Sequence, residues 1–152
     1  MNQTQHIKER LEHDLKDAMR AKDQVRLLTI RSLKAAIGNR EKEGSGPLTE
    51  DDLVAVIQKQ AKQRRDSIEQ FDNAGRDELA QRERDELAII ERYLPEQVSD
   101  DDIRRVIHDI IIRTGAAGKK DLGRVMGEAM SELRGRADGN RVRLAAQGLL
   151  ED

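Results

Sequence analysis

Apolar residues recur every three or four positions along most of the chain, which is the spacing of one face of an α-helix. A first stripe runs from Thr4 to Lys22, and a second runs from Gln24 to Glu43, where Asp23 can cap the helix. In the second stretch the apolar residues spread widely around the helix, so we expect it to contact more than one neighbour. The run Gly44-Ser45-Gly46-Pro47 then breaks the helix.

Two further helices are predicted before Pro95. Thr49 is followed by three acidic residues, which is typical of a helix start, because an N-cap side chain accepts backbone N–H groups and acids favour the positive end of the helix dipole. This third helix should end near Gly75, where the backbone can turn left-handed. A fourth follows from Asp77 to Tyr93. The four helices predict a first unit, residues 1–95.

The rest of the chain predicts three shorter helices. Their N-caps are Ser99, Asp121 and Asp138, and glycines end the first two. Glu96–Asp100 is the expected linker. We therefore predict an all-α protein of two helical units, with about four helices in residues 1–95 and three in residues 96–152.

Composition limits the core and the chemistry. Phe71 and Tyr93 are the only aromatic residues among 152, so the core must be aliphatic, and 38% charged residues with two prolines favour helices over a sheet. The chain has no cysteine, which excludes disulfides, thiolate metal sites and cysteine nucleophiles. No purely aliphatic run, Leu53–Ile57 and Ile110–Ile112 included, exceeds five residues, and Met1–Arg10 has no apolar signal core. We expect a soluble, cytoplasmic protein that does not bind membranes.

Candidate catalytic and metal-binding residues are few. His6 and His13 are seven residues apart, a rise of about 10 Å that is too large for one metal site, and His108 has no evident partner. Most acidic residues begin helices or alternate with arginine at helical spacing, as solvated helix faces do. Gly118-Lys119 is no phosphate-binding P-loop, because residue 113 is not glycine and residue 120 is not Ser or Thr. We predict no catalytic residue, no metal site and no cofactor.

One stretch stands out, residues 115–150, which holds seven of the eleven glycines. Between Arg113 and Arg143 there are eight Lys or Arg against four Asp or Glu, whereas the whole chain has a net charge of −2. Such a cluster can contact RNA phosphates or can be a solvated helix face, and charge alone does not decide between them. Because the chain has few aromatic rings that could stack on bases, the RNA hypothesis favours structured RNA that is recognised by its shape. The candidate RNA-binding residues are Lys119, Lys120, Arg124, Arg134, Arg136, Arg141 and Arg143.

Two glycines lie one turn apart within a predicted helix. Gly123 and Gly127 each cost up to about 1 kcal/mol relative to alanine, so they should have a use. Either a neighbouring helix crosses closely there, which we favour, or a ligand backbone approaches the smooth face. Close backbone approach is expected at the turn glycines Gly135 and Gly139 as well.

Several separate motifs resemble one family. They are Asp66-Ser67-Ile68-Glu69-Gln70-Phe71, Ala74-Gly75-Arg76-Asp77-Glu78-Leu79-Ala80, Glu83 with Glu86-Leu87, Tyr93-Leu94-Pro95, Lys120-Asp121-Leu122-Gly123-Arg124-Val125-Met126 and Gly135-Arg136-Ala137-Asp138-Gly139. In this order, and over essentially the whole chain, they resemble the YqeY-like proteins of the GatB/YqeY family.

The resemblance implies a function. The family is similar to the C-terminal helical and tail regions of the B subunit of the tRNA-dependent amidotransferase, which converts Glu-tRNA(Gln) or Asp-tRNA(Asn) to the amide form. The tail of that subunit engages tRNA, so the stretch Lys119–Arg124 and the turn Gly135–Gly139 with Arg141 become the RNA-facing residues by this resemblance. The catalytic cradle of the B subunit has no counterpart here, so carbon–nitrogen ligase activity with glutamine as amide donor is not expected from this chain alone.

Three hypotheses follow for the function. The first is a binding module for tRNA or another structured RNA that acts in translation. The second is a protein-interaction module that docks on an amidotransferase or aminoacyl-tRNA synthetase assembly. The third is an accessory part of a glutamine-dependent ligase. Sequence-specific DNA binding is not expected.

Overall fold

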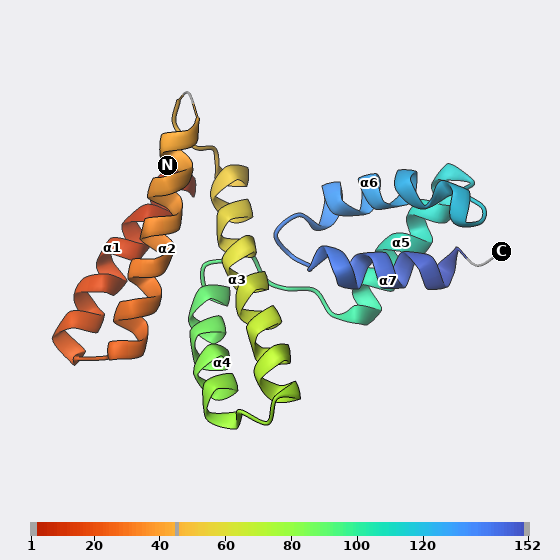
Figure 1. The fold of residues 1–152 in the computed structure, drawn as a ribbon. Coiled ribbons are helices and arrows are strands. Elements are labelled where there is room, and N and C mark those ends of the chain that lie inside the picture. The colour runs from red at the N-terminus through yellow and green to blue at the C-terminus, as the bar shows by residue number, and fades with distance from the viewer. Residues whose placement is uncertain (1–2, 45, 151–152) are drawn as a thin grey trace. The chain divides into compact units, whose positions relative to one another are not determined.

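The computed structural model describes residues 3–44 and 46–150, and within them every regular element is helical (Figure 1). Two compact units divide the chain, one ending at Leu94 and the other beginning at Pro95. Ser45, in the predicted break after the second helix, lies outside the described residues. The predicted all-α fold is confirmed. Among the described residues no helix is long and apolar enough to span a membrane.

The first unit contains four helices, α1 (Gln3–Ala21), α2 (Gln24–Glu43), α3 (Glu50–Asn73) and α4 (Asp77–Glu91). Helices α1 and α2 form one antiparallel hairpin and α3 and α4 form another (Figure 1). Helix α2 packs against α1, α3 and α4, which explains why its apolar residues spread so widely around the helix. The prediction of more than one neighbour for this helix is confirmed.

Local chemistry sets the ends of these helices as expected. The Asp23 side chain accepts a hydrogen bond from the Arg26 N–H at 3.2 Å. Thr49 and Asp52 form a capping box, in which each side chain accepts the backbone N–H of the other residue. Gly75 has φ +70°, so the backbone turns left-handed after α3.

The core of the first unit is aliphatic, and Tyr93 is the aromatic residue buried in it. The Tyr93 hydroxyl donates a hydrogen bond to Asp14, and the Arg10 guanidinium lies 5.0 Å from the centre of the Tyr93 ring. Burial, and then the bond to Asp14, raise the pKa of Tyr93, so the phenol stays neutral. These contacts join α1 to the residues that follow α4.

A half-buried arginine joins three helices of the same unit. Arg64, on α3, donates to Glu86 on α4 at 3.1 Å and to the Ser32 hydroxyl on α2 at 3.2 Å. Glu83 lies 3.7 Å from the same guanidinium. The side chain of Arg64 is only 15% exposed, so these partners replace water for most of its surface.

The second unit contains α5 (Asp100–Thr114), the short 3₁₀ turn η1 (Lys119–Asp121), α6 (Leu122–Leu133) and α7 (Gly139–Leu149). The three α-helices pack pairwise on one another. They bury an aliphatic core, whose residues include Ile103, Ile107, Ile110, Val125, Ala129, Leu133, Val142 and Ala146.

Three local features of the second unit differ from the sequence prediction. Ser99 caps α5 as expected, but the Asp121 side chain accepts the Ala117 N–H at 2.7 Å instead of capping α6. Asp138 occupies the N-cap position of α7 without a side-chain cap bond. The expected linker Glu96–Asp100 is held to its own unit, because the Val98 N–H donates to the Arg136 carbonyl at 2.8 Å and Asp100 begins α5.

The position of Arg64 makes a testable prediction for stability. Arg64→Ala would leave two neighbouring carboxylates, largely out of water, without their cation, so we expect a loss of about 2–3 kcal/mol in the free energy of unfolding, somewhat below a fully buried pair. Urea denaturation followed by circular dichroism measures it. The matched control is Lys62→Ala on the same helix, whose exposed pair with Asp66 should contribute less than about 0.5 kcal/mol. Equal losses in the two variants would contradict the special role of Arg64.

Glu83 gives a second prediction, for the pH dependence of stability. Burial, and then the neighbouring Glu86, raise the pKa of Glu83 above its usual value of 4.5. A carboxyl whose pKa is raised by folding destabilises the native state when it is ionised, and this cost disappears as pH falls through the folded pKa. We therefore expect Glu83→Gln to unfold at a higher temperature than the wild type at pH 7, with the difference closing below about pH 4.5. A Gln variant that is less stable at pH 7 would refute this assignment.

Candidate functional site

The seven candidate cations lie at different places in the second unit. Lys119 and Lys120 lie in η1, Arg124 lies on α6, Arg134 and Arg136 lie in the turn after α6, and Arg141 and Arg143 lie on α7. All seven are on the surface. Arg141 is partly buried, and the other six are exposed. Their role in RNA binding stays a prediction, and their contacts separate them into different groups.

Helix α6 has a smooth outer face. Gly123, Gly127 and Ser131 are spaced four residues apart and are exposed, and Arg124 lies next to them. The buried residues Val125, Ala129 and Leu133 follow the same spacing two positions later, so they lie on the opposite side of the helix. We call Gly123, Arg124, Gly127 and Ser131 the α6 outer stripe.

Within the described residues of the second unit, the preferred explanation for the two helical glycines is wrong. A Cβ atom added to Gly123 or Gly127 would meet nothing within 4 Å there, so no helix of this unit crosses α6 closely at these positions. The other explanation, approach by a ligand backbone, stays a prediction. Both glycines thus weaken α6, and no packing contact within the described part of their unit requires them.

The turn glycines differ from each other. Gly135 is buried and has φ +76°, a left-handed conformation that favours glycine. A Cβ atom on Gly139 would lie 3.9 Å from the Met130 methyl carbon, which is ordinary van der Waals contact. The close approach expected at Gly139 is therefore no tighter than a normal side-chain contact.

Acidic residues near the α6 outer stripe are already engaged. Arg113, on α5, donates to Glu128 at 2.8 Å and to Glu132 at 3.3 Å, and these hydrogen bonds raise the pKa of the Arg113 guanidinium. Asp121 accepts the Ala117 N–H and lies 3.7 Å from Arg124. Both glutamates of α6 thus have a cation from the neighbouring helix, which lowers their repulsion of an approaching anion.

Free N–H groups at the start of α6 are fewer than expected. The 3₁₀ turn uses them, because the Asp121 N–H donates to the Gly118 carbonyl and the Leu122 N–H donates to Lys119. The side chain of Lys120 is exposed, and no ion pair or hydrogen bond of it is found within residues 3–44 and 46–150. An anion at this end of α6 would therefore meet side-chain cations more than helix N–H groups.

Arg136, Arg141 and Arg143 make contacts within the unit. Arg136 Nε lies 3.4 Å from the Glu96 carbonyl, and Arg143 donates to the Asn140 side chain at 2.8 Å. Arg141 binds Asp100 and the Val98 carbonyl together. The guanidinium of Arg141 thus has protein partners on more than one side, unlike Lys120.

Sequence reasoning overlooked two residues near this surface. Gln97 donates to the Gly135 carbonyl at 2.7 Å and to the Pro95 carbonyl at 3.0 Å, so it holds the turn between α6 and α7. Asp100 was predicted only as the last residue of the linker, but it binds Arg141, 41 residues later. Charge of opposite sign at Asp100 and Arg141 is the only hint in the sequence, and many other pairs share it.

One group of side chains could hold a metal ion. His13, Asp14 and Asp17, on α1, place ligand atoms within 4.8 Å of one another. The spacing of the histidines alone does not predict this arrangement, because it joins one histidine to two carboxylates of the same helix. Asp14 already accepts the Tyr93 hydroxyl, and Asp17 lies 3.7 Å from His13 and 3.9 Å from Arg20. A divalent ion would have to compete with these contacts.

The glycines of the second unit give a prediction for stability. Gly123→Ala and Gly127→Ala should each stabilise the unit by up to about 1 kcal/mol, because both positions are helical and open. Gly135→Ala should instead destabilise it by about 1 kcal/mol or more, because its φ is positive. Thermal unfolding of the three variants measures the difference. Destabilisation by alanine at Gly123 would contradict the open face described above.

The chain is similar to known proteins over most of its length. The family model described as "Yqey-like protein" matches residues 8–150. A relative from Pyrenophora tritici-repentis, "Altered inheritance of mitochondria protein 41, mitochondrial", is 38% identical over 130 residues, which cover 84% of this chain and 71% of that protein. Proteins of the same name from Saccharomyces cerevisiae (strain YJM789) and Eremothecium gossypii are 36% and 44% identical, over 78% and 55% of this chain.

These relatives correct one expectation and confirm another. Their names describe mitochondrial proteins, which contradicts the expected cytoplasmic localisation. The matched region covers 67% of the Saccharomyces protein and 46% of the Eremothecium protein, so it is a part of each. The family predicted from the motifs is confirmed, since the family model covers nearly all of the described residues. The chain belongs to the YqeY-like family.

Proposed function

We propose that the second unit binds tRNA or another structured RNA along the α6 outer stripe, with Lys120 and Arg124 as direct phosphate contacts. The observation that carries the proposal is the open face at Gly123 and Gly127, which lies beside an exposed arginine. Glycines inside a helix reduce its stability, and among the described residues of the second unit no packing contact accounts for them. A ligand backbone that must come close to the helix does account for them.

The chemistry of this face suits a sugar–phosphate backbone. Without side chains at residues 123 and 127, a ligand strand can come close to α6 while the arginine and the lysine reach its phosphates. The Ser131 hydroxyl, further along the stripe, can donate or accept a hydrogen bond at a phosphate or a 2′-hydroxyl. No aromatic residue belongs to residues 95–152, so recognition by base stacking is not supported.

The family resemblance supports the same surface. The motif Lys120–Met126 contains Lys120 and, from the stripe, Gly123 and Arg124, and it resembles the tail of the amidotransferase B subunit, which engages tRNA. The resemblance does not extend to the catalytic cradle of that subunit. We therefore propose RNA binding without catalysis by this chain alone.

Salt-dependent binding tests the proposal. Unfractionated tRNA labelled with a fluorophore should bind the full chain, with affinity that falls steeply with salt, because each neutralised phosphate releases counterions. Lys120→Gln and Arg124→Gln should each weaken binding and each reduce the slope of log K against log salt by about one. Fluorescence anisotropy over a salt series measures both quantities. A folded chain that binds no tRNA at low salt would refute the proposal.

Two controls make this test specific. Arg105→Gln removes an exposed arginine of the same unit that lies on α5, and it should leave affinity nearly unchanged. Gly123→Ala combined with Gly127→Ala keeps every charge, yet it should weaken tRNA binding while it raises the unfolding temperature. If the double alanine variant binds tRNA as well as the wild type, the glycines do not serve ligand approach.

Docking on a protein partner is the competing proposal. It is favoured by two large apolar side chains on the surface of the second unit, Ile112 and Leu144, which are 67% and 69% exposed. Recovery of amidotransferase or synthetase subunits after nuclease treatment, together with no tRNA binding by the purified chain, would favour docking over RNA binding.

A further inference from the structure

A clasp of hydrogen bonds fastens the start of the second unit to the turn between α6 and α7. The Gln97 side chain donates to the Gly135 carbonyl at 2.7 Å, and the Val98 N–H donates to the Arg136 carbonyl at 2.8 Å. Arg136 Nε lies 3.4 Å from the Glu96 carbonyl, which adds a weaker contact in the opposite direction. Two consecutive carbonyls of this turn are thus bound by the segment that precedes α5.

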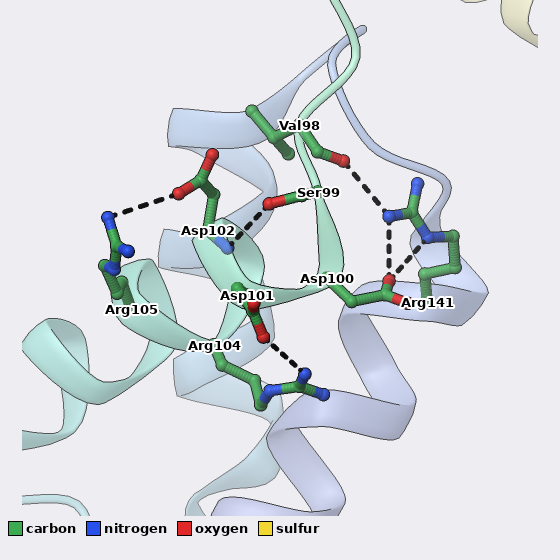
Figure 2. Close-up of polar contacts among 8 residues, drawn as sticks. All are labelled: Val98, Ser99, Asp100, Asp101, Asp102, Arg104, Arg105 and Arg141. Atoms are coloured by element: carbon green, nitrogen blue, oxygen red, sulfur yellow. Dashed lines mark hydrogen bonds and ion pairs between the residues drawn. The ribbon is translucent and has the colours of Figure 1, made fainter.

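Arg141 closes the clasp from α7 (Figure 2). Its Nε and Nη2 atoms lie 2.9 Å and 2.7 Å from the same oxygen of Asp100, and Nη2 also donates to the Val98 carbonyl at 3.0 Å. Figure 2 shows this guanidinium between the Val98 carbonyl and the side chain of Asp100, the first residue of α5. Three pieces of chain, the segment before α5, the start of α5 and the start of α7, are joined at one side chain.

The aspartates that follow Asp100 do not compete for Arg141. Asp101 accepts from Arg104 at 2.8 Å, and Asp102 lies 3.4 Å from Arg105 (Figure 2). Asp102 is also the residue whose N–H is capped by Ser99. Among the ion pairs of the acidic start of α5 drawn in Figure 2, the pair of Asp100 and Arg141 is therefore the one that connects α5 to a different helix.

We infer that Arg141 is a positioning residue for the turn after the α6 outer stripe, which carries the candidate RNA-binding residues Arg134 and Arg136, and is not itself a phosphate contact. This inference rests on the proposed function. Turning Arg141 toward a phosphate would break its charge-assisted bonds to Asp100 and leave the Val98 carbonyl without this donor, so the new contact would replace existing ones without a clear gain. In its observed position Arg141 fixes the segment before α5. That segment binds the Gly135 and Arg136 carbonyls, which lie in the same turn as Arg134.

Asp100 allows a test in which the two roles predict opposite signs. If only charge matters, Asp100→Asn removes a negative charge from the second unit and should strengthen tRNA binding. If the clasp positions the turn, the same change should weaken binding about five- to tenfold, the scale of one ordinary hydrogen bond lost at a partly exposed site. The salt slope should not change, because no phosphate contact is lost.

Two substitutions of Arg141 separate its charge from its geometry. Lysine keeps the positive charge but lacks the planar fork that binds Asp100 and the Val98 carbonyl together. We expect Arg141→Lys and Arg141→Gln to weaken tRNA binding about equally, both with an unchanged salt slope. Lys120→Gln, a loss of a direct contact, provides the comparison with a slope reduced by about one.

The experiment uses the full chain, unfractionated labelled tRNA and anisotropy over a salt series, with circular dichroism to establish that each variant is folded. Hydrogen exchange of the Val98 N–H supplies a readout that needs no RNA, and it should become faster in Asp100→Asn because the bond to Arg136 loosens. Normal affinity in Arg141→Lys, stronger binding in Asp100→Asn, or unchanged exchange at Val98 would each overturn the inference while leaving the proposed function intact. Absence of tRNA binding by the wild type would overturn both, and the exchange result would show whether the clasp itself exists.

Discussion

Both units depend on one constraint, which is that their helices must bury aliphatic faces with almost no aromatic rings to fill the core. Branched and straight-chain side chains fill the two cores, and Tyr93 is the one ring buried in the first. Aliphatic packing is non-directional, so several helix arrangements would bury similar apolar area. Polar groups at helix ends and crossings add the direction. Arg64 joins three helices of the first unit, and Arg141 joins the start of α5 to the start of α7 in the second.

These two arginines have the same physical role in different surroundings. Each satisfies acidic groups from another helix with a planar guanidinium that can donate in several directions. Arg64 is mostly shielded from water, so its loss would leave carboxylates with poor solvation. Arg141 is more exposed, so its ion pair contributes less to stability, and its effect is to hold backbone in place. The contacts of Arg64 are thus expected to contribute mainly to stability, whereas those of Arg141 are expected mainly to order the nearby backbone.

Sequence patterns were sufficient for the helices because local interactions determine them. The caps at Asp23, Thr49 and Ser99 form as predicted, since each side chain accepts the N–H group of the residue three positions later. At Asp121 the prediction of a side-chain cap is wrong, because a 3₁₀ turn inserts before α6 and the carboxylate binds Ala117 instead. Local pattern gives no warning of this, since Asp121 suits both arrangements.

The candidate site was harder to predict, because its chemistry depends on contacts between distant residues. The sequence grouped Lys120 and Arg141 as equivalent cations, but only three-dimensional contacts reveal that Arg141 binds Asp100. The two glycines of α6 show the reverse case, in which the sequence raised the right question and packing was the wrong answer. A glycine that faces open space lowers the stability of its helix, and no packing contact compensates for that loss. When a residue lowers helix stability and the packing of the fold does not explain it, a binding function is the explanation to test. In α6 these glycines lie beside Arg124.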